Sequence, residues 1–112
     1  MAKIINWRKI ESRIGLIEKV EDFYLEDKHY YLLQINFGKA LGFKKSVAQM
    51  NYFYQKGDLI GKTIVAVTNI APFQIGPWIS EVKVLTISDA SGNQLLVVPE
   101  KPGIEIGKTL NI

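Results

Sequence analysis

Acidic side chains and a single histidine are the residues of this chain with the types needed for acid–base chemistry. Five of the 11 acids lie just before the histidine, and the others, Glu81 among them, are scattered along the chain; the five are Glu18, Glu21, Asp22, Glu26 and Asp27. General acid–base catalysis needs groups whose pKa values are set apart, and His29 has no second histidine as a partner. We interpret the acids beside His29 as solvated loop residues and expect no catalytic residues.

Nucleophilic, nucleotide and metal chemistry lack their sequence signatures. The 112 residues include no cysteine, no G-x-S-x-G elbow, no G-x-x-x-x-G-K-[ST] loop and no G-x-G-x-x-G turn. Without thiolates or a second imidazole, a zinc site has too few of its usual ligands. We therefore expect no enzymatic activity, no cofactor and no bound metal.

The charge balance mildly favours an anionic partner. The chain has 14 basic and 11 acidic residues, for a net charge of +3. All the basic residues except Arg8 and Arg13 are lysines, and lysine lacks the planar, bidentate grip that phosphate and base edges reward. The basicity is thus a weak argument for specific nucleic-acid recognition.

Alternating apolar and polar residues predict a chain of short strands. The expected strands cover residues 14–20, 30–37, 41–50, 62–70, 82–87 and 95–98. A turn or single helical turn is expected at 51–55, between the third and fourth strands. Near the start of the chain, Ile4, Trp7 and Ile10 recur at every third position and predict a short helix that docks on the sheet or on a partner.

These elements predict one all-β domain spanning residues 1–112. Short strands with one helical insertion fit a closed or partly open Greek-key barrel, and an SH3-like barrel is the alternative. Gly15 either permits a bulge or sharp coil in the first strand or is simply tolerated there. The sequence has no apolar h-region and no apolar run near the ~20 residues of a membrane span, so we expect a cytoplasmic protein without membrane insertion.

Three stretches of the chain resemble the tRNA-binding domain family. They read FG at 37–38 with GFKKSVAQ at 42–49, LIGKTIVAVTN at 59–69, and SEVKVL at 80–85. The resemblance runs from about Trp7 to the C-terminus. It implies a five-stranded Greek-key OB-fold barrel, with the short N-terminal helix and C-terminal extension strands forming a two-fold homodimer interface.

For this chain the implied interface residues are Ile4, Trp7, Ile10, Ile104, Ile106 and Leu110. Closure of the barrel's own ends is the alternative role for these side chains. A symmetric dimer would present two identical binding sites to a bivalent partner.

The family's tRNA-binding lip follows the fourth strand, and this chain keeps only part of its pattern. The retained residues are Asn69, Pro72, Gly76 and Ser80. Phe73 and Gln74 stand where the family usually has basic residues, which should lower RNA affinity and its salt dependence. The triplet Ser80-Glu81-Val82 resembles the branch of the family formed by export-related chaperones.

The resemblance implies a ligand-binding surface made of seven residues: Lys44, Ser46, Asn69, Phe73, Gln74, Trp78 and Ser80. On the third strand we expect Lys44 to face the groove, because Phe43 and Val47 look like core residues. The alternative is that Lys44 and Lys45 are two solvated lysines on an edge strand. Phe73 and Trp78 either form an exposed aromatic cluster for apolar side chains or bases, or fold back as a lid on the core.

Two functions follow from these features. The first is a non-catalytic, dimeric chaperone that holds non-native or export-bound polypeptides without ATP, as the chaperone-like triplet and the apolar loop suggest. The alternative is a protein that binds tRNA or other structured RNA in the same groove, as the family and the net charge suggest.

Overall fold

The computed structural model describes residues 10–111, and the helix predicted around Ile4 and Trp7 lies outside them. Within residues 10–111, one short helix, α1 (Lys56–Leu59), lies among nine strands. The strands are β1 (Ser12–Leu25), β2 (Lys28–Asn36), β3 (Phe43–Ala48), β4 (Thr63–Val67), β5 (Phe73–Ile75), β6 (Trp78–Ser80), β7 (Lys83–Val84), β8 (Thr86–Ser88) and β9 (Gln94–Leu96). The strands predicted at 14–20, 30–37, 41–50, 62–70 and 95–98 are confirmed as β1, β2, β3, β4 and β9.

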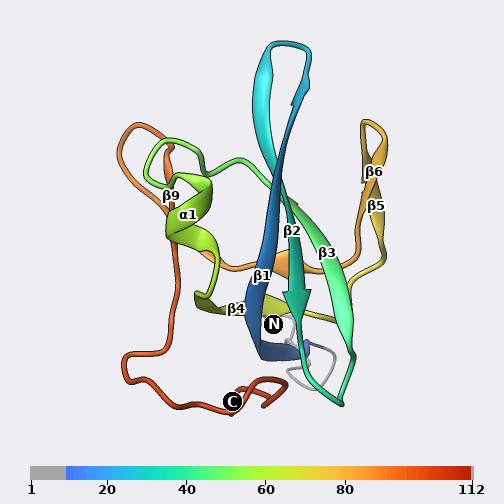
Figure 1. Ribbon diagram of the computed structural model, residues 1–112, viewed down its shortest axis with the longest axis vertical. Coiled ribbons are helices and arrows are strands. Elements are labelled where there is room, and N and C mark those ends of the chain that lie inside the picture. The colour runs from blue at the N-terminus through green and yellow to red at the C-terminus, as the bar shows by residue number, and fades with distance from the viewer. Residues whose placement is uncertain (1–9, 112) are drawn as a thin grey trace, which may run out of the picture.

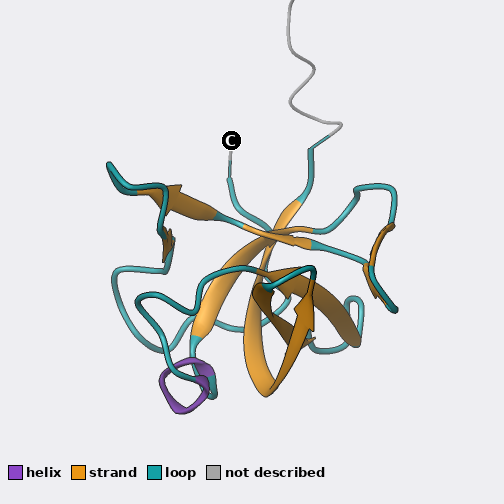
Figure 2. Ribbon diagram, turned by 90° about the horizontal axis from the view of Figure 1, so that it is seen from above, coloured by secondary structure: helices purple, strands orange, loops and turns teal. Residues whose placement is uncertain are grey.

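The strands pair antiparallel and confirm an all-β fold. The main sheet has five strands in the order β3-β2-β1-β4-β7, while β5 pairs with β6 and β8 with β9 in two separate hairpins. The long β1–β2 hairpin and the β5–β6 hairpin project on the same side in Figure 1, and Figure 2 shows the strands curving around the core. Among the strands that the structure describes, the pairing does not close into a complete ring.

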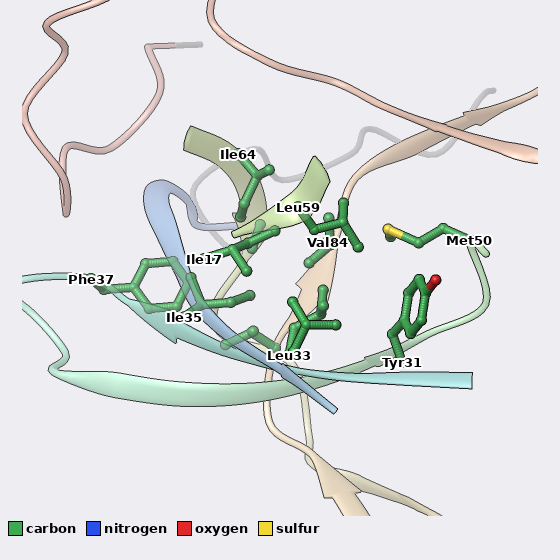
Figure 3. Packing of buried hydrophobic residues seen from close by; sticks show 12 residues of the cluster. Ile17, Tyr31, Leu33, Ile35, Phe37, Met50, Leu59, Ile64 and Val84 are labelled. Carbon is green, nitrogen blue, oxygen red and sulfur yellow. The ribbon is translucent and has the colours of Figure 1, made fainter. Parts of the chain in front are cut away.

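The core lies on the inner face of the curved sheet. Tyr31, Leu33 and Ile35 alternate along β2 and point inward, as a period of two requires. They pack against apolar residues from β1, β4, β7, α1 and the loops, as Figure 3 shows: Ile17, Val20, Phe37, Met50, Leu59, Ile64, Ala66, Val82 and Val84.

Gly15 leaves room for this core. A Cβ atom at position 15 would lie 2.5 Å from Cγ2 of Ile35 and 2.7 Å from Cε1 of Phe37. The view that this glycine is merely tolerated is therefore wrong. The register irregularity of β1 lies further along, between Ile17 and Lys19, where the strand pairs with β2.

The turn predicted at residues 51–55 is confirmed at 51–53, and the helical insertion between β3 and β4 follows it as α1. The N–H of Gln55 donates a hydrogen bond to Oδ2 of Asp58 at 2.9 Å, which caps the start of α1. Leu59, at the end of α1, is fully buried in the core. The helix thus begins where a cap and a buried apolar residue are available, and residues 51–53 form a turn before it.

Two predictions for the last third of the chain are wrong. The strand expected at 82–87 is divided at Leu85 into β7 and β8. Leu85 donates its N–H to the Val65 carbonyl of β4, whereas its own carbonyl accepts the N–H of Val97, just after β9, so the chain changes its pairing partner at this residue. The C-terminal extension strands do not form in residues 97–111, where one isolated bridge joins Arg13 to Thr109. Two prolines without N–H groups and two glycines with positive φ interrupt this segment: Pro99, Pro102, Gly103 and Gly107.

Candidate functional site

The face of the main sheet that points away from the core is the candidate site. Paired residues of an antiparallel ladder point to the same side, and on this side Leu32 faces Val47, Gln34 faces Lys45, and Asn36 faces Phe43. We call these six residues the outer face; Leu32 and Val47 are buried, at 4% and 3% exposed, and the other four are partly or fully exposed. It lies along β2 and β3, next to the β5–β6 hairpin, whose β6 strand packs beside β3.

The faces of β3 are the reverse of the sequence prediction. Lys44 is paired with the core residue Ile35, so it points to the core side and is half-buried. Lys45 is the lysine of the outer face, and Phe43 beside it is 51% exposed. Phe43 misled the prediction because it is apolar although it lies on the outer face; Val47, on the same face, is buried as expected. A ligand contact for Lys44 stays a prediction.

Ser46 also lies on the core side, paired with Leu33. It is 1% exposed, and no described atom accepts or donates a hydrogen bond to its hydroxyl. A buried hydroxyl without a partner costs stability. In this structure Ser46 is therefore part of the packing beneath the outer face.

The β5–β6 hairpin carries the aromatic residues of the predicted site to the outer face. Nζ of Lys45 lies over the Trp78 ring, 5.2 Å from its centroid, a cation–π geometry. Trp78 is half-buried, and Phe73 on the neighbouring strand is 38% exposed. The exposed Gln74 donates from Nε2 to the Gly76 carbonyl at 3.0 Å, across the turn of the hairpin. Trp78 is thus partly covered by Lys45, while Phe73 and Gln74 reach solvent.

Ser80 and Glu81 fasten this hairpin to the edge of β3. The Ser80 hydroxyl accepts the N–H of Val47 at 3.1 Å and donates to the Val82 carbonyl at 3.0 Å. Glu81 donates its N–H to the Lys45 carbonyl at 2.8 Å, and its Oε1 accepts the Lys45 N–H at 2.9 Å. Ser80 is completely buried. This motif therefore acts as a substitute for strand pairing, and Ser80 supports the site from below.

Asn69 lies in the connection from β4 to β5, at the end away from the hairpin and beside the start of β1. Its Oδ1 accepts the N–H of Glu11 at 2.9 Å. The Glu11 carboxylate in turn accepts hydrogen bonds from Arg13 at 3.0 Å and from the Thr68 hydroxyl at 2.7 Å. The Arg13 bond, followed by that of Thr68, lowers the pKa of Glu11 from its ordinary value. The structure thus brings Phe73, Gln74 and Trp78 together with Lys45, and it places Asn69 with the residues that anchor β1.

The β1–β2 hairpin extends the outer face beyond the end of β3. Phe23 and Tyr30 are paired across it and stack with their ring centroids 5.1 Å apart. Its turn is made by Glu26 and Asp27, both exposed and both with positive φ, which agrees with their interpretation as solvated loop acids. Near the tip, Leu25 lies close to Gly76 of the β5–β6 hairpin. The two hairpins therefore approach each other at their tips.

Asp22 is not the solvated loop residue that the sequence suggested, because it lies within β1 and is paired with cations. Asp22 contacts Nε2 of His29 at 2.7 Å and Nζ of Lys56 from α1. The hydrogen bond from Lys56, and then that from His29, lower the pKa of Asp22. Residues 10–111 contain no group of three or more His, Cys, Asp or Glu side chains that could hold a metal ion.

Apolar side chains are exposed near both ends of the described chain. Ile104 is 46% exposed, Ile10 and Leu110 are similarly exposed, and Ile106 is half-buried against Gly38. These are the predicted interface residues that the structure describes, and they lie at or beside the segment 107–110. No described helix is long and apolar enough to cross a membrane.

The segment 107–110 is held against the first residues of β1. Gly107 donates to the Ile14 carbonyl at 2.7 Å, Ile14 donates to Lys108 at 2.9 Å, and Leu110 donates to Ser12 at 3.0 Å. Nη1 of Arg13 adds a hydrogen bond to the Gly107 carbonyl at 2.7 Å. The apolar side chains of this end are therefore presented on a fixed backbone.

No family model matches the chain, but relatives and solved structures do. Methionine–tRNA ligase of Nanoarchaeum equitans is 30% identical over 102 residues, which are 91% of this chain and 13% of the ligase. The chain thus spans a small part of the curated relatives that it matches.

Among the solved structures that match along almost the whole chain are two chaperones. The chaperone CsaA of Bacillus anthracis is 32% identical, with a TM-score of 0.88, covering 97% of this chain and 100% of that one. The CsaA chaperone protein of Picrophilus torridus is 40% identical, with a TM-score of 0.84, covering 96% and 100%. Identity at this level over complete chains, together with the ligase match, shows that the chain belongs to the tRNA-binding domain family that includes the CsaA chaperones.

Proposed function

We propose that this protein is a non-catalytic, homodimeric chaperone of the CsaA type that holds non-native or export-bound polypeptides in the cytoplasm without ATP. The observation that carries the proposal is the composition of the hairpin beside the outer face. Residues 71–79 include no charged side chain, and Phe73, Trp78 and Ile79 lie among them. Apolar surface offered on a projecting hairpin suits the apolar side chains that unfolded polypeptides expose.

The topology supports an OB-fold barrel in a single domain as the framework of this activity. β7 ends the main sheet and lies near β3, and the Glu81–Lys45 hydrogen bonds bridge the space between the sheet's two edges. OB-folds bind ligands on the face of their second and third strands, between the loop joining strands one and two and the loop joining strands four and five. In this chain those positions are the outer face, the β1–β2 hairpin and the β5–β6 hairpin.

A homodimer would cover the exposed apolar end. A two-fold interface uses the same patch on both subunits, so Ile10, Ile104 and Leu110 would pack against their own copies or near them. Ile4 and Trp7 would add to this patch, and the dimer would offer two hairpins to one long polypeptide. Light scattering should give the mass of two chains, and Ile104→Glu should shift the mass towards one chain.

Structured RNA, chiefly tRNA, is the second candidate ligand. Lys45 on the outer face, the exposed ring of Phe43 and the matched segment of methionine–tRNA ligases favour it. A single lysine already engaged with Trp78 offers few phosphate contacts, which is why we rank RNA second. RNA binding would weaken steeply as salt rises, whereas apolar contacts to a polypeptide would not.

The experiment compares aggregation of a chemically denatured client with binding of tRNA, using one preparation of the full chain. Wild type should suppress aggregation, and Phe73→Ala should suppress it less. Tyr52→Ala is the matched control, because Tyr52 is a 71% exposed aromatic residue of the turn after β3, outside the outer face. Wild type that leaves aggregation unchanged yet binds tRNA with a steep salt dependence would replace the chaperone proposal by the RNA one.

A further inference from the structure

We propose that the free edge of β5 captures an extended polypeptide segment by strand addition, so that the client becomes a third strand of the β5–β6 hairpin. This inference rests on the proposed chaperone function and gives its mode of binding. It concerns the main chain of β5, in addition to the aromatic side chains of the hairpin.

The edge is free because of the position of β5. Within residues 10–111, β5 pairs only with β6, and it is β6 that packs beside β3. Figure 1 shows β5 as the outer strand of the hairpin, with its second edge turned away from the main sheet. Ala71, Pro72, Phe73 and Gln74 are all exposed. An unpaired strand edge of this kind is a template for another strand.

The turn determines which backbone groups face outward. Gly76, with a φ of 57°, and Pro77 join β5 to β6, and Ile75 is paired with Trp78 across them. In a tight hairpin the residues flanking the turn exchange hydrogen bonds, and bonding alternates along the strand. The N–H and C=O groups of Gln74 therefore point to the free edge.

Pro72 limits this edge to a short stretch. It has no N–H group, so the ladder that a client could form ends there. Proteins often use a proline or a very short strand to keep an edge from pairing with copies of itself. A client would thus be held by few main-chain bonds and released readily.

Charge selects a neutral occupant. Residues 71–79 carry no charge, so the hairpin itself offers a polyanion no cation, and the neighbouring Lys45 is already engaged with Trp78. Phe73 and Ile79 are both exposed, and they lie on opposite faces of the hairpin because Ile79 is paired with Gln74, the residue next to Phe73. An added strand with apolar side chains would contact apolar surface on both faces. Main-chain hydrogen bonds also do not depend on the amino-acid sequence of the client, which suits a protein that holds many different polypeptides.

The test uses two variants at one position and two probe peptides. Gln74→Pro removes the outward N–H, whereas Gln74→Ala keeps it and removes only the side chain. The probes are a short uncharged peptide of alternating valine and threonine and a twin in which every second amide is N-methylated. We expect Gln74→Pro to bind the unmodified peptide roughly tenfold more weakly than Gln74→Ala, as loss of one or two hydrogen bonds implies. The twin is made in two registers, which methylate alternate sets of amides. Wild type should show a similar loss of affinity for the register whose methyl groups face the β5 edge.

The outcomes separate the two proposals. Wild type that neither binds the unmodified peptide nor suppresses aggregation would end the chaperone proposal itself. Wild type that binds the unmodified peptide and both N-methylated registers equally would overturn strand addition alone. Thermal denaturation shows whether Gln74→Pro is folded, and if it is not, the peptide pair on wild type decides the question.

Discussion

The β5–β6 hairpin and the C-terminal segment 104–110 both present apolar side chains to solvent, but they are attached to the sheet in different ways. The hairpin is fastened at its base, where Ser80 and Glu81 bond to β3. The segment is bonded along residues 107–110 to the start of β1, with Arg13 as an additional donor. A surface attached at one end can adjust to varied ligands, whereas one bonded along its length suits a fixed interface between subunits.

Gly107→Ala should have the largest effect, because it acts on the segment that is bonded along its length. Gly107 has a φ of 89°, and a Cβ atom there would lie 2.5 Å from the Phe37 carbonyl oxygen. We expect a loss of about 3 kcal/mol in the free energy of unfolding, measured by urea denaturation. Gly92→Ala is the control for backbone strain alone, since its φ is 86° and nothing lies within 4 Å. Equal losses in both variants would contradict a specific role for the close approach at Phe37.

Ser80→Ala should loosen the hairpin at its base. It removes the partner of the Val47 N–H and of the Val82 carbonyl, so we expect a loss of about 1–3 kcal/mol in unfolding free energy. Ser46→Ala is the matched control, because it removes another buried hydroxyl that has no partner among the described atoms and should be neutral or stabilising. Similar losses in the two variants would show that burial of the side chain, and not the hydrogen bonds of Ser80, holds the hairpin.

Acid should weaken the anchoring of β1 through Glu11. Because hydrogen bonds from Arg13 and Thr68 lower the pKa of Glu11 in the folded state, its contribution to stability is present above the ordinary glutamate pKa. The contribution is lost as the pH falls through the folded pKa. Wild type should therefore be more stable than Glu11→Gln at neutral pH, with a difference that shrinks in acid. Thermal denaturation of the two proteins at several pH values measures this stability difference. A difference that stays constant with pH would exclude the linkage.

Lys45→Met should have the smallest effect on stability. It keeps most of the aliphatic side chain and removes the ammonium over Trp78, which at an exposed site contributes about 0.5–1 kcal/mol. The change should leave client binding intact and abolish most of any salt-dependent RNA binding. A large loss of aggregation suppression in Lys45→Met would assign the lysine, and not the aromatic hairpin, to the client.

Alternation along the chain predicted most of the sheet because one face of each long strand is buried. The period of two in β2 and the apolar run of β4 carry that signal directly. Gly15 could be noticed in the sequence, but its reason could not, because Ile35 and Phe37 come from a strand and a loop far along the chain. Packing against distant residues leaves no local pattern.

The site was predicted less completely than the sheet. Phe43 looked like a core residue, which reversed the two lysines of β3, and the strands β5 and β6 are too short to show a period. The triplet Ser80-Glu81-Val82 was noticed as a family feature, but its physical role depends on the N–H groups of Val47 and Lys45. The prolines and glycines after residue 98 were visible in the sequence and argued against the strands expected there.

Site-specific photo-crosslinking tests the central claim most directly. A photo-reactive diazirine amino acid at position 73, in the full chain, would be illuminated in a mixture of a permanently unfolded polypeptide and tRNA. A chaperone that holds clients on the β5–β6 hairpin should become linked to the polypeptide, at low and at high salt alike. Linkage to tRNA alone, or linkage to the polypeptide that is equal when the same group replaces Tyr52, would contradict it.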